Sequence, residues 1–383
     1  MNKINTNILN DLKNLLEDYM PDANAEDFIN GIDDENFSTR TIRKEMSDID
    51  KSQVDYDLPK GTDYRLLIDR MITQSKKLLP EDKYYKLIID FSQLMLFAGE
   101  TAYSLEIIQE LHSELESRNR FKSILAEAKL MLSKIYWSQA EWDECEMYVS
   151  EAKRIFSIVS SDSGLGKCEN VLGTLYGEKG EFEKARDHFK NALTLLKDTD
   201  DLSSIAMILT NLGIINTING EYETAAWDYK NAIEKFLKLK DVRRLSRVYH
   251  NLGMLYTQME DYDTALEEFN NCITISTENN YLSNCAVSYI GKSFIYTKLN
   301  NPGLADAYTD KAMEIACKIN DTLSIADIYK IKGMIQKEMS NFQLSEEFFE
   351  NSIRLNKDFE SKFNEAETTA ELKKLLQKSN KVD

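Results

Sequence analysis

Apolar residues recur along this chain with a helical spacing, and the whole pattern repeats every forty residues. The stretch NLGMLYTQMEDYDTALEEFNNCI at 251–273 follows NLGIINTINGEYETAAWDYKNAI at 211–233 and VLGTLYGEKGEFEKARDHFKNAL at 171–193. Each copy predicts a first helix carrying Leu-Gly, a polar turn, and a second helix with Ala and aromatic residues on one face. Because one such hairpin cannot bury its apolar face alone, the copies predict a stack with a continuous core.

Small and aromatic residues hold fixed positions in this period. A glycine of the first helix is expected where the two helices cross most closely, with an alanine of the second helix opposite it (Gly173, Gly213 and Gly253; Ala185, Ala225 and Ala265). Aromatic residues are expected to open the second helix and, seven residues later, to wedge between hairpins (Phe182, Tyr222 and Tyr262; Phe189, Tyr229 and Phe269). Weaker copies carry Ser133, Ser293 and Gly333 at the glycine position. We count six clear repeats of forty residues and a degenerate one around 91–111.

The period also suggests where the chain divides. It fails before about residue 80, and Pro59 and Gly61 indicate a linker. We therefore expect a small N-terminal helical bundle at 1–60, a superhelix of hairpins at 61–356 and a capping or connector helix at 357–383. Apolar positions at helical spacing mark an amphipathic helix within the N-terminal bundle: Ile4, Ile8, Leu12, Leu15 and Tyr19.

Composition narrows the classes of function. A net charge of −18 disfavours broad binding to nucleic acids or membrane surfaces, which are themselves anionic. The five cysteines lack metal-ligand spacing, and Cys145 and Cys272 fall at alanine positions of the repeat, where we expect small core residues. No catalytic, phosphate-binding or metal motif is found, so we expect no enzyme activity, cofactor or metal. The N-terminus lacks the apolar core of a signal peptide, which favours the cytoplasm.

The Leu-Gly-x-x-Tyr, Tyr/Phe-x-x-Ala and aromatic-x-x-Ala pattern resembles the tetratricopeptide repeat over roughly residues 85–356. That resemblance implies an all-α fold, a right-handed superhelix of antiparallel helix hairpins. The forty-residue length is similar to that of peptide-binding members, including the bacterial Rap proteins and related intracellular pheromone receptors. The resemblance implies a peptide or protein segment held in the concave groove and an N-terminal bundle that responds to it.

First-helix residues that the core does not need are the candidates for ligand contact. In DVRRLSRVYHNLGMLY the spacing places Arg243, Arg247, His250 or Asn251, and Met254 on one stripe, basic within an acidic protein. Asn211 repeats the position of Asn251, and Asn170 lies one residue earlier in its own copy. Asparagine side chains can donate to and accept from a peptide backbone at once. The alternative is that Arg243 and Arg244 pair with acids such as Glu234 or Asp241, and that the asparagines are structural.

The N-terminal bundle leaves its output open. In STRTIRKE, residues Arg40, Arg43 and Lys44 are candidates for contact with DNA or with an effector such as a response regulator, although residues 1–60 are acidic as a whole. The leading hypothesis is a non-enzymatic regulator that relays ligand occupancy to this bundle, as a quorum-sensing receptor or transcription regulator would. The alternatives are a scaffold or co-chaperone-like adaptor and the sensory portion of a longer signalling protein. A homodimer is also left open.

Overall fold

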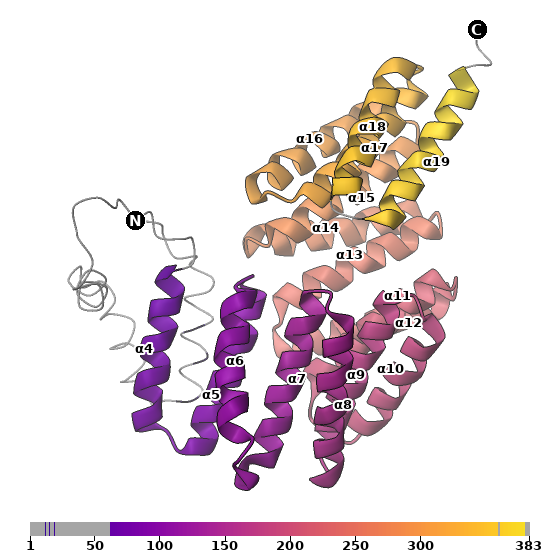
Figure 1. The fold of residues 1–383 in the computed structure, drawn as a ribbon. Coiled ribbons are helices and arrows are strands. Elements are labelled where there is room, and N and C mark those ends of the chain that lie inside the picture. The colour runs from indigo at the N-terminus through magenta and orange to yellow at the C-terminus, as the bar shows by residue number, and fades with distance from the viewer. Residues whose placement is uncertain (1–11, 13–14, 16–18, 20–61, 359–360, 380–383) are drawn as a thin grey trace, which may run out of the picture. The chain divides into compact units, whose positions relative to one another are not determined.

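The computed structural model of the protein describes residues 12, 15, 19, 62–358 and 361–379. Within these residues all regular elements are helical (Figure 1). The helices are α4 (Thr62–Leu78), α5 (Glu81–Phe97), α6 (Thr101–Leu115), η1 (Asn119–Phe121), α7 (Lys122–Ser138), α8 (Trp142–Ile158), α9 (Asp162–Glu178), α10 (Phe182–Leu196), α11 (Leu202–Ile218), α12 (Tyr222–Leu239), α13 (Val242–Gln258), α14 (Tyr262–Glu278), α15 (Leu282–Lys298), α16 (Pro302–Ile319), α17 (Thr322–Glu338), α18 (Phe342–Asp358) and α19 (Lys362–Ser379).

These helices form two compact units, which we describe separately. Unit 1 ends at Asp198 and contains the hairpins α5–α6, α7–α8 and α9–α10. Unit 2 begins at Thr199 and contains α11–α12, α13–α14, α15–α16 and α17–α18, followed by α19. The first helices from α7 to α17 begin at residues forty apart, and α5–α6 is the degenerate repeat. The predicted all-α architecture of paired helices is confirmed.

An aromatic ring, rather than an alanine, faces the glycine of each first helix. A Cβ at Gly213 would lie 2.6 Å from the ring of Tyr229, and a Cβ at Gly173 would lie 2.6 Å from that of Phe189. The expected glycine–alanine contact is therefore wrong in its partner: the ring sixteen residues later fills the space. Gly253 and Gly333 repeat the arrangement with Phe269 and Phe349.

Two repeats have a serine instead of the glycine, and there the opposing residue is smaller than an aromatic ring. Where the first helix has Ser133 or Ser293, the residue sixteen positions later is Val149 or Thr309, and all four side chains are buried. A larger residue in the first helix is thus matched by a smaller one in the second, as a close-packed interior requires. The predicted wedging between hairpins is seen at Phe269, whose ring also lies against Gly291 of the next first helix. Cys145 and Cys272 are fully buried, as expected.

The turns between helices repeat every twenty residues. Most helices end at a residue with positive φ, including Lys240 at 54° and Glu260 at 60°. Non-glycine residues of proteins rarely adopt this backbone conformation. The Asp261 N–H then donates to the carbonyl of Tyr256 at 3.0 Å, and the Asp261 carboxylate accepts from the Thr264 N–H at 3.3 Å. One residue thus closes a helix and caps the next, which keeps the turn to three residues.

Three residues near the N-terminus pack onto the start of the array. Leu12 is fully buried in a core cluster with Ile68, Met71 and Phe91, and Leu15 and Tyr19 lie beside it. The Tyr19 hydroxyl donates to Asp90 Oδ2 of α5 at 2.6 Å. The candidate residues Arg40, Arg43 and Lys44 lie outside the described residues, as does most of the predicted bundle at 1–60.

We predict that Gly213→Ser destabilises the protein by about 1–3 kcal/mol, because the new side chain must displace the Tyr229 ring. Adding Tyr229→Val recreates the Ser133–Val149 pairing, so the double variant should cost at least about 1 kcal/mol less than the sum of the two single changes. Urea unfolding followed by circular dichroism measures both values. The control is Gly177→Ser, since a Cβ there meets only Ala185, at 4.0 Å. Equal effects at Gly213 and Gly177 would contradict the packing assignment.

Candidate ligand-binding face

The first helices of successive hairpins in unit 2 lie against one another. Contacts join α11 to α13, α13 to α15, and α15 to α17. We use the term first-helix face for the side of these four helices that carries the residues at two repeat positions: Asn211 and Asn251 at one, and Ile214, Met254, Phe294 and Met334 at the other. The face also includes Arg243 and Arg247 of α13.

An apolar stripe crosses the first-helix face. Ile214 and Met254 are 39% and 40% exposed. Phe294 and Met334 are half-buried and pack partly against the core around Ile331. Because these four residues are forty apart on adjacent helices, their side chains are spaced by one helix-to-helix distance, about 8–10 Å. The stripe therefore offers regularly spaced apolar contacts.

Two exposed arginines lie along α13 beside this stripe. The guanidinium carbon of Arg243 is 5.8 Å from the centre of the Tyr281 ring. Arg247, one turn further along, makes no hydrogen bond or ion pair with any residue that the structure describes. The alternative pairing is confirmed for the neighbouring Arg244, which binds the Asp241 carboxylate. Glu234 pairs with Lys238 instead. Arg247 consequently has no carboxylate partner among the described residues.

Asparagines lie at the expected repeat position. Asn251 is half-buried, four residues after Arg247 on the same side of α13, and its side chain has no hydrogen-bond partner among residues 62–358 and 361–379. Asn211 is half-buried at the same position of α11. Asn170 belongs to α9 of unit 1, where its backbone carbonyl accepts from the Thr174 hydroxyl at 2.9 Å. The structure thus places Arg243, Arg247, Asn251 and Asn211 on neighbouring helices, and ligand contact by each stays a prediction.

His250 points toward the next helix. Its Nδ1 is 3.1 Å from the Ser288 hydroxyl of α15, and its ring centre lies 5.6 Å from that of Phe269. Burial, together with the positive charge of Arg247, lowers the pKa of His250 to about 4. The imidazole is therefore neutral near pH 7 and contributes to packing between α13 and α15. Its role in ligand binding stays a prediction.

Unit 1 has first helices of a different chemistry. At the repeat position of Arg247, α7 carries Glu127 and α9 carries Lys167. At the repeat position of His250, α9 carries Asn170. Burial raises the pKa of the Glu127 carboxyl, and the nearby Lys86 and Lys167 oppose that shift. The repeat position that forms the apolar stripe of unit 2 is Lys134 or Thr174 in unit 1. These first helices therefore present charged and polar groups where those of unit 2 present apolar ones.

Sequence reasoning missed the apolar stripe, because it considered each helix alone and placed Met254 only on the arginine stripe. The signal lies in the comparison of repeats: Ile214, Met254, Phe294 and Met334 occupy one position of the period at intervals of forty. Buried positions of the period are also apolar, so only the observed exposure separates the stripe from the core.

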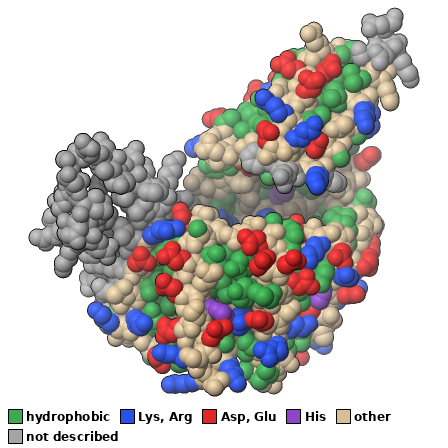
Figure 2. Space-filling view, viewed as in Figure 1, with side chains coloured by type: hydrophobic (Ala, Val, Ile, Leu, Met, Phe, Trp, Pro, Cys, Tyr) green, Lys and Arg blue, Asp and Glu red, His purple; other side chains and the backbone are tan. Residues whose placement is uncertain are grey.

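Other chemistry is sparse in the described residues. Their His, Cys, Asp and Glu side chains form no group of three or more that could hold a metal ion. Cys145, Cys168, Cys272 and Cys285 are buried, and burial raises the pKa of the Cys145 and Cys168 thiols to about 12. None of the helices in residues 62–358 and 361–379 is long and apolar enough to cross a bilayer. On the side seen in Figure 2, acidic and basic side chains are interspersed, so that side offers no extended basic patch to a nucleic acid.

Known proteins give an independent view of the fold. Residues 204–278, which cover α11 to α14, match the family model described as tetratricopeptide repeat. A search of curated proteins finds no match.

Several solved structures have the same arrangement of helices. The apo form of RapI has a TM-score of 0.57 at 18% identity, covering 72% of this chain and 99% of that one. NprR in complex with its cognate peptide NprX has a TM-score of 0.57 at 16% identity, covering 78% and 84%. The signal transduction ATPase PH0952 of Pyrococcus horikoshii, which has a tetratricopeptide repeat sensor, has a TM-score of 0.58 at 13% identity, covering 84% of this chain and 54% of that one. At these identities the likeness shows the fold alone.

We predict that acid destabilises the protein through His250 before carboxylates titrate. The unfolded imidazole has an ordinary pKa of 6.5 and the folded one a pKa of about 4, so between these two values the unfolded imidazole is protonated, whereas the folded imidazole is neutral. Stability is therefore fully present above pH 6.5 and falls toward pH 4, by up to about 2 kcal/mol at pH 5. His250→Gln should flatten this loss in urea unfolding between pH 7.5 and 5. His112→Gln should flatten part of the loss as well, because burial also lowers the pKa of His112. An unchanged slope in His250→Gln would refute the assignment.

Proposed function

We propose that this tetratricopeptide-repeat chain is a non-enzymatic regulator whose unit 2 binds an extended peptide or protein segment along the first-helix face. The observation that carries the proposal is the juxtaposition on α13 of Arg247 and Asn251, two polar side chains without described partners, with the exposed Met254 of the apolar stripe. Solved neighbours include NprR bound to its peptide NprX, which supports a peptide as the class of ligand.

The chemistry of the face specifies the ligand. Asparagine donates to and accepts from a peptide backbone, so Asn251 and Asn211 suit an extended main chain that cannot pair with itself. Arginine binds a carboxylate through two parallel hydrogen bonds, so Arg247 suits an acidic side chain or a C-terminal carboxylate. The stripe of Ile214, Met254, Phe294 and Met334 then receives apolar side chains of the same segment. Arg243 and His250 lie next to these contacts and complete the proposed set, and Asn170 is its counterpart in unit 1.

The proposed relay runs to the N-terminal residues of the chain. A ligand that touches several repeats favours one of the arrangements that the stacked hairpins can adopt, and so shifts the population of that arrangement. Leu12 and Tyr19 contact the core and Asp90 of the first repeats, which supports a mechanical link between residues 1–60 and the array. Hydrogen exchange of the peptide that contains Leu12–Tyr19, measured with and without ligand, tests this link. Exchange that does not respond to a bound ligand would leave a scaffold without relay.

A second candidate is the sensory portion of a longer signalling protein. The resemblance to PH0952, whose repeat sensor belongs to an ATPase, favours this class. Both candidates share ligand binding by the repeats. They differ in the output: DNA or a response regulator contacted by Arg40, Arg43 and Lys44 in the first, and a further domain in the second. Retention of DNA by the full chain, and its loss in Arg40→Glu with Arg43→Glu, would favour the first.

The binding prediction uses a peptide that native mass spectrometry identifies with the purified protein. Arg247→Glu together with Asn251→Ala should weaken its binding at least about 10-fold, because a charge-assisted and a neutral hydrogen bond are both lost. Isothermal titration calorimetry gives the affinity, and circular dichroism should show unchanged helicity. The matched control is Arg354→Glu on the exposed side of α18. A double variant that binds as tightly as the parent would show that the ligand lies elsewhere.

A further inference from the structure

The last helix, α19, takes the place of an eighth first helix. It begins at Lys362, forty residues after the start of α17, and packs against α18 and α17 as each first helix packs against the preceding hairpin. Within unit 2, the contacts that hold α19 are those with α18 and α17. Its attachment therefore depends on the interface with α17 and α18.

That interface is more polar than the equivalent ones before it. At the two equivalent positions the second helix α12 presents Ala232 and Phe236, both buried. The helix α18 presents Ser352 and Asn356 there, both fully buried, whereas its Ser345 and Phe349 pack on Gly333 of α17 within the hairpin. Two apolar positions have thus become polar, which removes part of the hydrophobic stabilisation at this interface.

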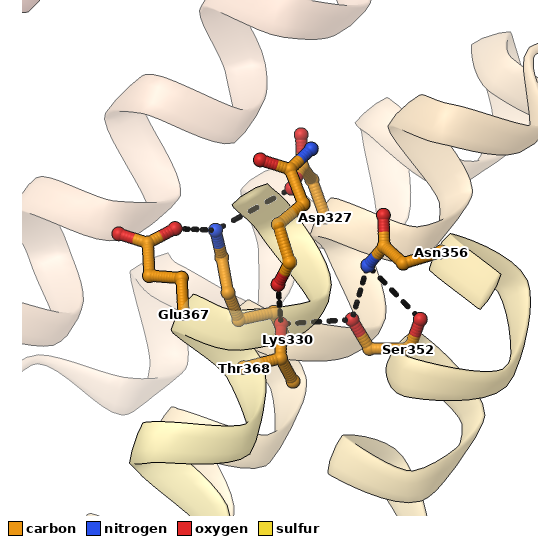
Figure 3. A network of polar contacts seen from close by, with 7 residues as sticks. Asp327, Lys330, Ser352, Asn356, Glu367 and Thr368 are labelled. Carbon is orange, nitrogen blue, oxygen red and sulfur yellow. Dashed lines mark hydrogen bonds and ion pairs between the residues drawn. The ribbon is translucent and has the colours of Figure 1, made fainter. Parts of the chain in front are cut away.

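Buried polar groups at this interface are incompletely satisfied. The Ser352 and Thr368 hydroxyls are 3.4 Å apart across α18 and α19, and the Asn356 amide donates to the carbonyl of Ser352 at 3.0 Å (Figure 3). Asn356 Oδ1 has no hydrogen-bond partner among the described residues. An unmatched buried acceptor of this kind costs stability while α19 is docked, and water can satisfy it when α19 leaves.

Ion pairs supply the specificity that the apolar contacts lack. Lys330 of α17 lies between Asp327 of the same helix and Glu367 of α19, with its Nζ 2.8 Å from Glu367 Oε2 (Figure 3). Lys337 of α17 binds Glu371 of α19 at 2.7 Å, and both side chains are less than one-fifth exposed. The two acids are four residues apart, so one face of α19 matches a pair of lysines on α17. Leu375 of α19 is almost fully buried as well.

We propose that α19 is a displaceable helix and that the end face formed by α17 and α18 accepts the α19 of a second copy in exchange for its own. The second copy is the occupant that this interface specifies, because its α19 carries the same two acids at the same spacing. Exchange of an identical element replaces every contact without loss, so it is a low-cost route to a dimer. The attached α19 normally prevails because its tether gives it a high effective concentration. This inference does not depend on ligand binding at the first-helix face.

The first test requires no substitution. Hydrogen exchange of the full chain should show α19 amides at least about 10-fold less protected than those of α17, because a helix held through a polar interface opens locally. Raising NaCl from about 50 mM to about 500 mM should lower the protection of α19 and leave that of α13 and α14 unchanged, since salt screens the ion pairs. Equal protection of α19 and α17 at both salt concentrations would overturn the proposal.

The second test uses two charge-reversed full-length chains. Lys330→Glu with Lys337→Glu makes the end face acidic, and Glu367→Lys with Glu371→Lys makes α19 basic, so each variant repels its own helix. Mixed together, each α19 meets a complementary end face on the other chain. Analytical ultracentrifugation should show a species of twice the 44.2 kDa chain mass in the mixture. Each variant alone should stay monomeric.

Two outcomes of this second test would overturn the exchange. One is a mixture that stays monomeric while hydrogen exchange shows α19 released in both variants. The other is dimerisation of each variant alone to the same extent as the mixture, because the contact would then not depend on the lysine–glutamate match. The control pair is Lys238→Glu and Glu234→Lys, which alters an exposed ion pair within α12 and should leave the mass unchanged.

Discussion

Volume matching between a first helix and an aromatic ring sixteen residues later is the constraint on which the rest of this structure depends. A ring fits between two helices only where the opposing residue is glycine, as at Gly213 and Tyr229, and a serine is accompanied by valine or threonine. Because dense packing leaves no room for both a ring and a Cβ, this pair fixes how closely the helices of a hairpin approach. At Phe269 the same ring also touches the next hairpin, so the spacing within a hairpin and the spacing between hairpins are set together.

Much of this fold could be predicted from the sequence because repetition averages out local ambiguity. Single helices are ambiguous, but six copies of one pattern place Leu212–Gly213 and Ala225 on facing helices without knowledge of coordinates. The partner of the glycine could not be predicted, because spacing along a helix gives a face and not the depth to which a ring reaches across it. The same limit applies to the candidate site: spacing placed Arg247 and Asn251 on one stripe, but the turn of His250 toward Ser288 and the exposure of Met254 depend on packing by neighbouring helices.

The repeats of unit 2 share the same helix-hairpin backbone and differ in the polarity of the surfaces that they bury. The interface behind α12 is closed by apolar side chains, whereas the interface behind α18 is closed by serine, asparagine and two lysine–glutamate pairs. Apolar burial favours permanent association, while buried polar groups are stable only when their specific partners are present. The chemistry of the interface between a second helix and the next helix thus differs between α12 and α18. The first helices also differ in side-chain chemistry at one repeat position, since those of unit 1 carry Glu127 and Lys167 where α13 carries Arg247.

The turns that close every twenty residues have a consequence for how such a chain can change length. A residue such as Asp261 ends one helix with its N–H and starts the next with its carboxylate, so a turn leaves no slack to absorb a residue gained or lost. A single insertion would rotate every later side chain of its helix by about 100° away from the partner helix. The addition or removal of a whole forty-residue module returns each side chain to an equivalent neighbour. The gene for such an array can therefore lengthen or shorten in modules, and the length of the first-helix face would change in steps of one hairpin.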